Sequence, residues 1–168
     1  MDVPLLDYVI GLGSNLGDRR ANLQSAVHAL SGLGEVAAVS ALYETAPVGP
    51  PQPNYLNAAV RLSSSLVPRD LLDRMLSFER AQGRERRERW GPRTLDLDVL
   101  WADGWVVDEP GLKLPHPELR SRAFALAPLV DVAPDARDPL SGMPYVEILT
   151  RLDRTGVREL EGTRAGWL

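Results

Sequence analysis

The chain has 168 residues, 44% of them apolar and 25% charged, and it carries a net charge of −4. This size fits one domain with a short accessory piece, and the composition excludes a disordered or collagen-like chain. The absence of cysteine excludes disulfides and thiol chemistry, and the longest apolar run, residues 123–130, is too short for a membrane span. An acidic start without a basic segment is not typical of a signal peptide, so we expect a cytoplasmic protein.

Strands and helices alternate in the first part of the chain. Helices are predicted where apolar residues recur at spacings of three and four, and strands where β-branched and aromatic residues cluster or polar and apolar residues alternate. Asp18 is a candidate helix cap, and Pro68 suits the first turn of a helix. In order, the expected elements are a strand over 8–12, a helix over 18–32, strands over 36–45 and 55–64, a helix over 68–82 and a strand over 94–101.

The rest of the chain is less regular. Asp103-Gly104 predicts a hairpin turn, after which the chain should return beside the strand over 94–101. Further along, the expected elements are this return strand over 105–107 and helices over 119–130 and 144–153, with a core over about 8–153 and a loosely held polar tail over 154–168.

The order strand, helix, strand, strand, helix, strand is the ferredoxin-like arrangement of the α+β class. An antiparallel sheet then carries two helices on one face, and this chain would add a hairpin strand and C-terminal helices. If Leu95, Leu97 and Val99 face the two helices, Asp96 and Asp98 lie on the open face of the sheet. Both carboxylates should therefore be accessible.

Asp96 and Asp98 form a candidate metal site. Side chains two residues apart on a strand project from one face about 6.5–7 Å apart, and at an effective dielectric of about 20 two such charges repel by about 2 kcal/mol. Carboxylates with room for water favour Mg²⁺ or Mn²⁺, and two such ions suit phosphoryl transfer. A solvated strand face is the alternative explanation of the same alternation.

The residues just before this strand are rich in arginine. Between Arg80 and Arg93, six arginines and two glutamates give a local charge of +4, which leaves −8 on the rest of the chain. Because guanidinium groups bind phosphate oxygens well, the sequence RERRERWGPR over 84–93 predicts a polyphosphate site beside the carboxylates. A solvated charged surface would explain the arginines alone, but their position directly before the acidic strand favours the phosphate site.

Two further motifs are less specific. His116 lies between two prolines that restrict how its ring can pack, so it is a candidate functional residue, whereas His28 lies inside the first helix and is expected to be structural. The glycine run GLGSNLG over 11–17 follows a strand, but Leu16 occupies the third glycine position of a dinucleotide-binding motif, and the Gly-Lys-Ser/Thr of a P-loop is absent. We interpret the run as a structural turn.

Several longer motifs resemble one enzyme family. They are GLGSNLGD at 11–18, YETAPVG at 43–49, YLNAAV at 55–60, RWGPRTLDLD at 89–98 and LPHPELRSRAF at 114–124. In this order and over residues 8 to about 150, they resemble 6-hydroxymethyl-7,8-dihydropterin pyrophosphokinase of folate biosynthesis. The central block is long and specific, so chance agreement is improbable.

The resemblance implies transfer of the terminal pyrophosphoryl group of ATP to the hydroxymethyl oxygen of a reduced pterin, with release of AMP. Asp96 and Asp98 would hold two Mg²⁺ ions, and Arg84 and Arg93 would be catalytic. The other ATP-binding positions would be Glu79, Arg86, Val99, His116 and Arg122. The pterin slot would be formed by Thr45, Val48, Tyr55, Asn57, Trp90 and Phe124.

The chain departs from the family pattern in several places, which bear on nucleotide affinity rather than on the reaction. The loop over 83–90 is one residue shorter. The substitutions are Ala46 for proline, Leu76 for glutamine, Gly111 for arginine and Pro117 for tyrosine.

Other functions also fit a fold of this kind. A nucleic-acid-binding module would need a basic sheet face, which Asp96 and Asp98 disfavour. A regulatory ligand-binding domain would need no magnesium, and a different phosphotransferase would use the same metal site for another acceptor. We expect a monomer that binds ATP and a reduced pterin, with no nucleic-acid or membrane partner. The residues alone leave open whether the product is ADP or AMP, and the resemblance favours AMP.

Overall fold

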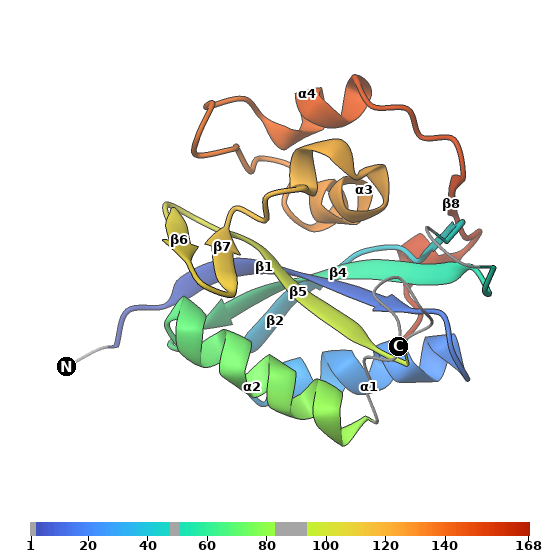
Figure 1. Ribbon diagram of the computed structural model, residues 1–168, viewed down its shortest axis with the longest axis horizontal. Coiled ribbons are helices and arrows are strands. Elements are labelled where there is room, and N and C mark those ends of the chain that lie inside the picture. Colours follow the sequence, from blue (N-terminus) through green and yellow to red (C-terminus); the bar gives the residue numbers. More distant parts are fainter. Residues whose placement is uncertain (1–2, 48–50, 83–93) are drawn as a thin grey trace.

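A computed structural model describes residues 3–47, 51–82 and 94–168. Two layers of helices enclose a twisted antiparallel sheet, with α1 and α2 on one face and α3 and α4 on the other (Figure 1). The helices are α1 (Arg19–Ser31), α2 (Pro68–Ala81), α3 (Ala123–Val132) and α4 (Tyr145–Thr150), with 3₁₀ turns η1 (Leu119–Ser121) and η2 (Thr163–Ala165). The strands are β1 (Leu6–Ser14), β2 (Glu35–Val39), β3 (Tyr43–Thr45), β4 (Tyr55–Ser64), β5 (Asp96–Ala102), β6 (Val107–Glu109), β7 (Leu112–Leu114) and β8 (Val157–Glu159).

The main sheet confirms the ferredoxin-like prediction. Its strand order is β5-β1-β4-β3-β8, with β2 paired to the other end of β4, and the pairs are antiparallel. The first strand is longer than expected, because β1 continues through Gly11 and Gly13 to Ser14 instead of turning there. The turn follows at Gly17, whose φ of 73° suits glycine.

The helices of the first layer form where the apolar spacing predicts them. Asp18 caps α1 by accepting a hydrogen bond of 3.1 Å from the Ala21 N–H, and Pro68 occupies the first turn of α2. Leu23 and Leu30 of α1 and Leu71 of α2 are fully buried against the sheet. Leu95, Leu97 and Val99 belong to this same core, as their alternation predicts.

The second helical layer corrects the expectation that Asp96 and Asp98 lie on an open face. Leu126 and Leu129 of α3 and Tyr145 of α4 pack on that face in a second buried core with Leu100 and Trp101. Leu100 and Trp101 are adjacent in sequence yet both face this layer, because the β1–β5 register shifts between Val9 and Ile10. The two aspartates therefore lie beside a covered region, not on a bare sheet.

The predicted strand over 36–45 is divided into β2 and β3. Val39 lies opposite Val60, but Tyr43 lies opposite Asn57, so the register on β4 slips by one residue between them. Ser40 bridges the break: its Oγ accepts a 2.8 Å bond from the Ala59 N–H and donates to the Ala41 carbonyl. At this break the Ser40 side chain supplies hydrogen bonds that a neighbouring strand backbone would otherwise supply. The apolar and aromatic pattern that predicted one strand over 36–45 does not reveal such a break.

The predicted return of 105–107 beside β5 is wrong. The Asp103 N–H donates to the Asp7 carbonyl on β1, and the exposed Trp105 leads the chain outward instead. β6 then pairs with β7 in a separate two-stranded sheet around Gly111, whose φ is 77°. The backbone N–H of His116 donates to the Leu100 carbonyl, so the segment after β7 takes the place beside β5 that the hairpin was expected to fill.

The expectation of a loosely held tail is also wrong. After α4 the chain adds β8 to the sheet edge beside β3 and continues around that edge toward α1 (Figure 1). Trp167 is only 2% exposed, and its Nε1–H donates to the Ser40 carbonyl at 2.7 Å. Arg20 and Gln24 of α1 both donate to the Trp167 carbonyl. The C-terminal residues therefore pack along the β3 edge of the sheet and connect this edge to α1.

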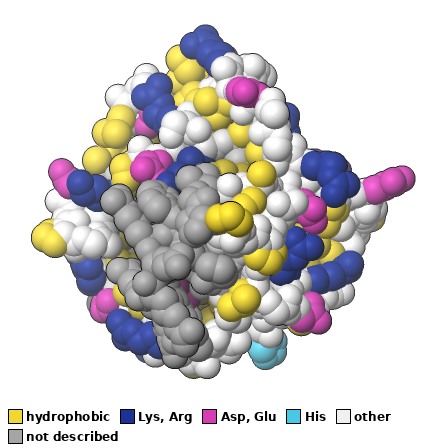
Figure 2. Space-filling model, turned by 45° about the vertical axis from the view of Figure 1, so that its right-hand side comes forward, with side chains coloured by type: hydrophobic (Ala, Val, Ile, Leu, Met, Phe, Trp, Pro, Cys, Tyr) yellow, Lys and Arg dark blue, Asp and Glu magenta, His cyan; other side chains and the backbone are white. Residues whose placement is uncertain are grey.

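Charges of both signs are interspersed over the face seen in Figure 2 outside the grey residues. Within the three described ranges, none of the helices is both long and apolar enough to cross a bilayer.

Candidate functional site

A cavity of about 530 Å³ lies on the α3 side of the sheet. Its floor crosses the strands where β1 has glycine: Gly13 lies between Asp96 of β5 and Asn57 of β4, and Gly11 lies opposite Asp98. Because neighbouring strands are about 4.8 Å apart, Asp96 and Asn57 stand at positions about 10 Å apart across the floor. Because Gly11 and Gly13 have no side chains, Leu100 lies close against β1 at Gly11, and Asn57 lies close against it at Gly13.

The β5 end of this floor carries the two predicted carboxylates. Asp96 and Asp98 are half-buried, line the cavity and alternate with the buried Leu97 and Val99. No group of three or more His, Cys, Asp or Glu side chains that could hold a metal is found in the described part of the chain. Two carboxylates with access to a cavity suit Mg²⁺, which keeps water or substrate phosphate as its remaining ligands. The donor set therefore fits magnesium bound together with a polyphosphate.

The β4 and β3 side of the floor carries a polar pair. Thr45 Oγ1 donates a short hydrogen bond to Asn57 Oδ1, and both side chains are buried. A Cβ atom on Gly13 would lie 3.1 Å from Asn57 Nδ2, so the amide nitrogen of Asn57 lies over the glycine. The threonine thus fixes the amide with its N–H donors toward the cavity.

Two aromatic residues face the same cavity from different elements. Tyr55 begins β4, and Phe124 lies in the first turn of α3. Arg122, the residue that precedes α3, lies with its guanidinium 5.6 Å from the centre of the Phe124 ring and forms an ion pair with Glu118. An aromatic and cationic surface with an amide at its edge suits a flat polar heterocycle.

His116 lies near this site but does not line the cavity. Its Nδ1 accepts a hydrogen bond of 3.2 Å from the Glu118 N–H. Burial lowers the pKa of His116, the nearby Arg122 lowers it further, and Asp96 opposes these effects. The imidazole is therefore a neutral ring at pH 7 in a region where arginine and aspartate charges meet.

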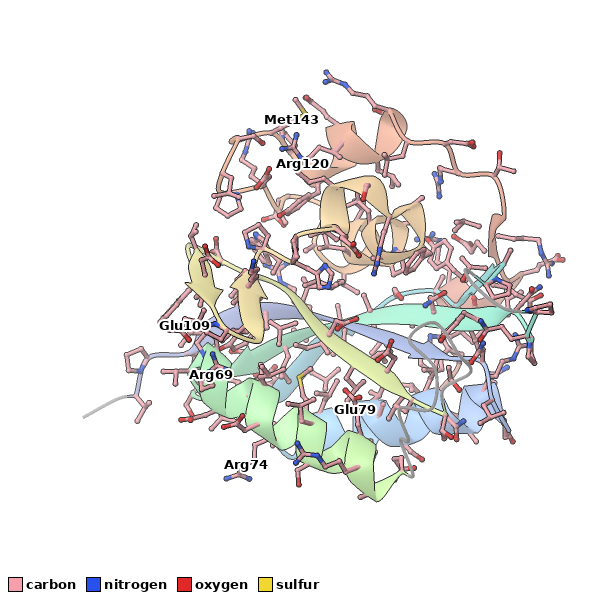
Figure 3. All side chains as sticks on the ribbon, in the orientation of Figure 1. Arg69, Arg74, Glu79, Glu109, Arg120 and Met143 are labelled. Atoms are coloured by element: carbon pink, nitrogen blue, oxygen red, sulfur yellow. The ribbon has the colours of Figure 1, made fainter. Side chains whose placement is uncertain are left out.

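Glu79 and Val99 are placed on the opposite side of the sheet from the cavity. Glu79 of α2 is 1% exposed and accepts a 3.2 Å bond from the Leu97 N–H through Oε1. Figure 3 shows this side chain in the layer between α2 and the sheet. The Val99 side chain belongs to the core of the α1 and α2 layer.

The structure thus brings together seven of the predicted site residues around the cavity and leaves others apart. Those on the cavity are Thr45, Tyr55, Asn57, Asp96, Asp98, Arg122 and Phe124. Those predicted residues that lie outside the described residues are Val48, Arg84, Arg86, Trp90 and Arg93.

The C-terminal segment supplies cavity residues that the sequence analysis did not identify. Asp153, Thr155 and Val157 line the side near Thr45 and Ala46. The Ala46 N–H donates to the Gly156 carbonyl at 3.3 Å, a bond that a proline at this position could not make. In the sequence, this contact is therefore marked only by Ala46, which stands where the family pattern has proline.

The three other substitutions lie away from the cavity lining, and the shorter loop over 83–90 lies outside the described residues. Leu76 is half-buried on α2, Gly111 forms the turn between β6 and β7, and Pro117 is exposed beside His116.

Comparison with known proteins agrees with the motifs. Residues 9–134 match the family model described as 7,8-dihydro-6-hydroxymethylpterin-pyrophosphokinase (HPPK). The chain is 44% identical over 156 residues to the 2-amino-4-hydroxy-6-hydroxymethyldihydropteridine pyrophosphokinase of Pseudomonas aeruginosa. This match covers 91% of this chain and 96% of that protein. It is 42% identical over 151 residues to the protein of the same description from Synechocystis sp., covering 89% and 77% of the two chains.

Solved structures share the fold at low sequence identity. A crystal structure of Plasmodium falciparum HPPK-DHPS with pterin and p-hydroxybenzoate matches with a TM-score of 0.72 at 14% identity. The match covers 90% of this chain and 42% of that chain, so this chain spans less than half of the longer protein.

Proposed function

Because this chain belongs to the 7,8-dihydro-6-hydroxymethylpterin-pyrophosphokinase family, we propose that it transfers the terminal pyrophosphoryl group of ATP to 6-hydroxymethyl-7,8-dihydropterin in folate biosynthesis. The products are AMP and the pterin diphosphate. The observation that carries this proposal is one cavity with two carboxylates on β5 and a buried Thr45–Asn57 pair on β3 and β4. A phosphate donor and a heterocyclic acceptor can meet between these two groups.

The pterin ring binds at the Asn57 side of the cavity. Tyr55 and Phe124 offer apolar ring surfaces, and the Asn57 amide donates to an acceptor at the edge of the heterocycle. Thr45 holds that amide in one orientation, so less entropy is lost when the ring binds. The match to the family motifs assigns Val48 and Trp90, which lie outside the described residues, to the same slot.

The phosphates bind at the β5 side. Asp96 and Asp98 would hold two Mg²⁺ ions together with phosphate oxygens, and these ions would neutralise negative charge on the phosphates and on the departing AMP. The two aspartates orient the phosphate chain toward the acceptor, because the cavity that they line extends across β1 to Asn57 on β4.

In the reaction, the hydroxymethyl oxygen attacks the β-phosphorus. The new bond joins this oxygen to the β-phosphorus, the bond from the β-phosphorus to the oxygen of the α-phosphate breaks, and the hydroxyl proton passes to water. Arg84 and Arg93 stabilise charge that develops in this transition state. The remaining ATP contacts are assigned to Arg86, His116 and Arg122, whereas the buried side chains of Glu79 and Val99 face away from the cavity and would support β5 rather than contact ATP.

The identity of the nucleotide product tests the proposal directly. The protein is incubated with ATP, Mg²⁺ and the hydroxymethyl dihydropterin, and the products are separated and followed by ³¹P NMR. We expect AMP and pterin diphosphate in equal amounts. ADP with a pterin monophosphate would identify an ordinary kinase, and the absence of any pterin-dependent product would contradict both assignments.

A further inference from the structure

A side chain of α1 holds the chain segment that leads into β5. Asn22 lies near the start of α1, and its Nδ2 donates a hydrogen bond of 3.2 Å to the Thr94 carbonyl, although the two residues are 72 positions apart. The same nitrogen donates to the Leu16 carbonyl at 2.9 Å and to Ser14 Oγ at 3.1 Å. Because these neighbours are all oxygens that accept, the arrangement requires a hydrogen-bond donor at this position.

The Asn22–Thr94 bond lies where the pairing of β1 with β5 ends. The register pairs Gly13 with Asp96 as its last pair, while Ser14 of β1 remains paired with β4 on its other side. β5 is also an edge strand of the main sheet, and residues at the end of an edge strand open most easily. Asn22 connects Ser14 to Thr94 just beyond the last pair, where it does the work of a further pair of strand residues.

Asp96 lies between two points at which helices hold β5. On one side, the fully buried Leu95 separates it from Thr94, whose carbonyl is bonded to α1. On the other side, the neighbouring Leu97 N–H donates to Glu79 of α2 at 3.2 Å. The backbone at Asp96 is therefore fixed from both helices of the first layer.

We propose that Asn22 is a positioning residue for the metal site, because its bond to Thr94 fixes the start of β5 and with it the Asp96 carboxylate. This inference rests on the proposed function, in which Asp96 and Asp98 hold Mg²⁺ together with the phosphates of ATP. Asp98 depends less on Asn22, since the residues on both sides of Asp98 are paired with β1. Asn22 itself does not line the cavity and acts only through Thr94.

Asn22→Ala tests the bond in the protein without ligands. Backbone hydrogen exchange is followed by NMR at residues 95–97 and, for comparison, at residues 99–102 of the same strand. Loss of one hydrogen bond at the end of the strand should let this end open more often. Exchange at 95–97 should therefore become roughly 5-fold faster, while exchange at 99–102 changes much less.

Titration calorimetry with a non-hydrolysable ATP analogue tests the metal site. Affinity for the analogue is measured with Mg²⁺ and with a chelator, and the ratio of the two is the gain in affinity from the metal. In Asn22→Ala this gain should fall on the order of 10-fold, because partners that orient metal ligands commonly contribute that much. Affinity in chelator should stay unchanged. In rate assays, the Mg²⁺ concentration for half-maximal turnover should rise by a similar factor, while the KM for the pterin stays the same.

Gln24→Ala is the matched control for a general loss of stability. Gln24 is half-buried on the same helix and likewise donates to a distant backbone carbonyl, that of Trp167 at 2.7 Å. The variant should lose stability but keep the exchange at 95–97 and the full gain from Mg²⁺.

Ser14→Ala separates the bond to Thr94 from the other contacts of Asn22. It removes one of the acceptors and keeps the Thr94 bond, so it should resemble wild type in both measurements. If Ser14→Ala lost as much of the Mg²⁺ gain as Asn22→Ala, the Thr94 bond would not be the cause and the proposal would be wrong.

The outcomes distinguish the positioning role from the proposed function. If the wild-type protein forms AMP and Asn22→Ala keeps the full gain from Mg²⁺, the role of Asn22 is wrong and the proposed function stands. An equal loss of the gain in Gln24→Ala would also overturn this role. If the wild-type protein gains affinity from Mg²⁺ and loses it in Asn22→Ala but forms no pterin product, the proposed function fails and the role of Asn22 stands. A wild-type protein that gains nothing from Mg²⁺ would overturn both.

Discussion

Gly13 of β1 lies directly opposite Asn57 of β4, and a Cβ atom on Gly13 would approach Asn57 Nδ2 to 3.1 Å. Such a contact is shorter than ordinary van der Waals packing, so the amide would have to move. Because Thr45 holds the other end of this amide, movement would break the orientation that presents its donors to the cavity.

Gly13→Ala should therefore weaken pterin binding by roughly 10-fold, the loss of about one good hydrogen bond, while ATP binding changes little. Separate titrations of the two ligands measure this. Gly32→Ala is the matched control, because Gly32 ends α1 at a φ of −80° that alanine adopts readily. Normal pterin affinity in Gly13→Ala would show that the Asn57 amide does not contact the ring.

Asp96→Ala and Asp98→Ala should each remove most activity, by more than about 10²-fold, because a missing ligand leaves phosphate charge uncompensated. The fold should remain intact, and the metal-free protein should be slightly more stable because two like charges no longer face each other. Steady-state rates over a magnesium titration and thermal unfolding with a chelator check the two effects. Near-normal turnover at saturating magnesium in either variant would contradict the metal-ligand assignment.

The pH response of His116 should report on bound ATP. Burial and Arg122 hold the pKa of His116 below its usual value of 6.5. The unfolded chain therefore binds more protons than the folded protein, so the contribution of His116 to stability is complete above pH 6.5 and is lost as the pH falls below it. Phosphates bound near the ring should raise this pKa, since they oppose the effect of Arg122.

An NMR titration of the imidazole with and without a non-hydrolysable ATP analogue measures this change. His116→Asn should flatten the fall in stability below pH 6.5. A His116 pKa that does not change when the analogue binds would remove this residue from the ATP site.

The sequence predicted the layered core well because that core depends on local periodicity. The spacing of Leu23, Ala26 and Leu30 defines α1, and the alternation from Leu95 to Val99 places both aspartates on one face. These patterns record which side of an element is buried, and the structure confirms them. They also placed Asp96 and Asp98 on one strand and Asn57 on another, while the role of Asn57 in the site came from the family resemblance, and all three residues line the cavity.

Contacts between segments far apart in the chain were not predictable in this way. Ser40 breaks the expected strand because its side chain bonds to Ala59, and Trp167 is buried because its indole reaches Ser40. Asp153 reaches the cavity only because β8 pairs with β3. Each of these contacts joins residues whose local sequence is polar or irregular, so no periodicity marks them.

Trp167 should contribute strongly to stability although it is the penultimate residue. It is 2% exposed, packs in the core between the sheet and the α1 and α2 layer, and donates to the Ser40 carbonyl at 2.7 Å. Trp167→Ala should lower the free energy of unfolding by about 3–5 kcal/mol through lost burial, and Trp167→Phe by about 1–2 kcal/mol through the lost donor. Urea unfolding measures both changes.

Trp105→Ala is the control for this prediction, because Trp105 is 38% exposed in the turn after β5 and its loss should change the free energy of unfolding by less than about 0.5 kcal/mol. The Trp167 variants should also weaken pterin binding more than ATP binding, since Ser40 lies between β2 and β3 and β3 carries Thr45. Equal stability of Trp167→Ala and wild type would mean that the C-terminal residues do not hold the β3 edge in solution. A stability loss with unchanged pterin affinity would instead confine Trp167 to folding and separate it from the substrate site.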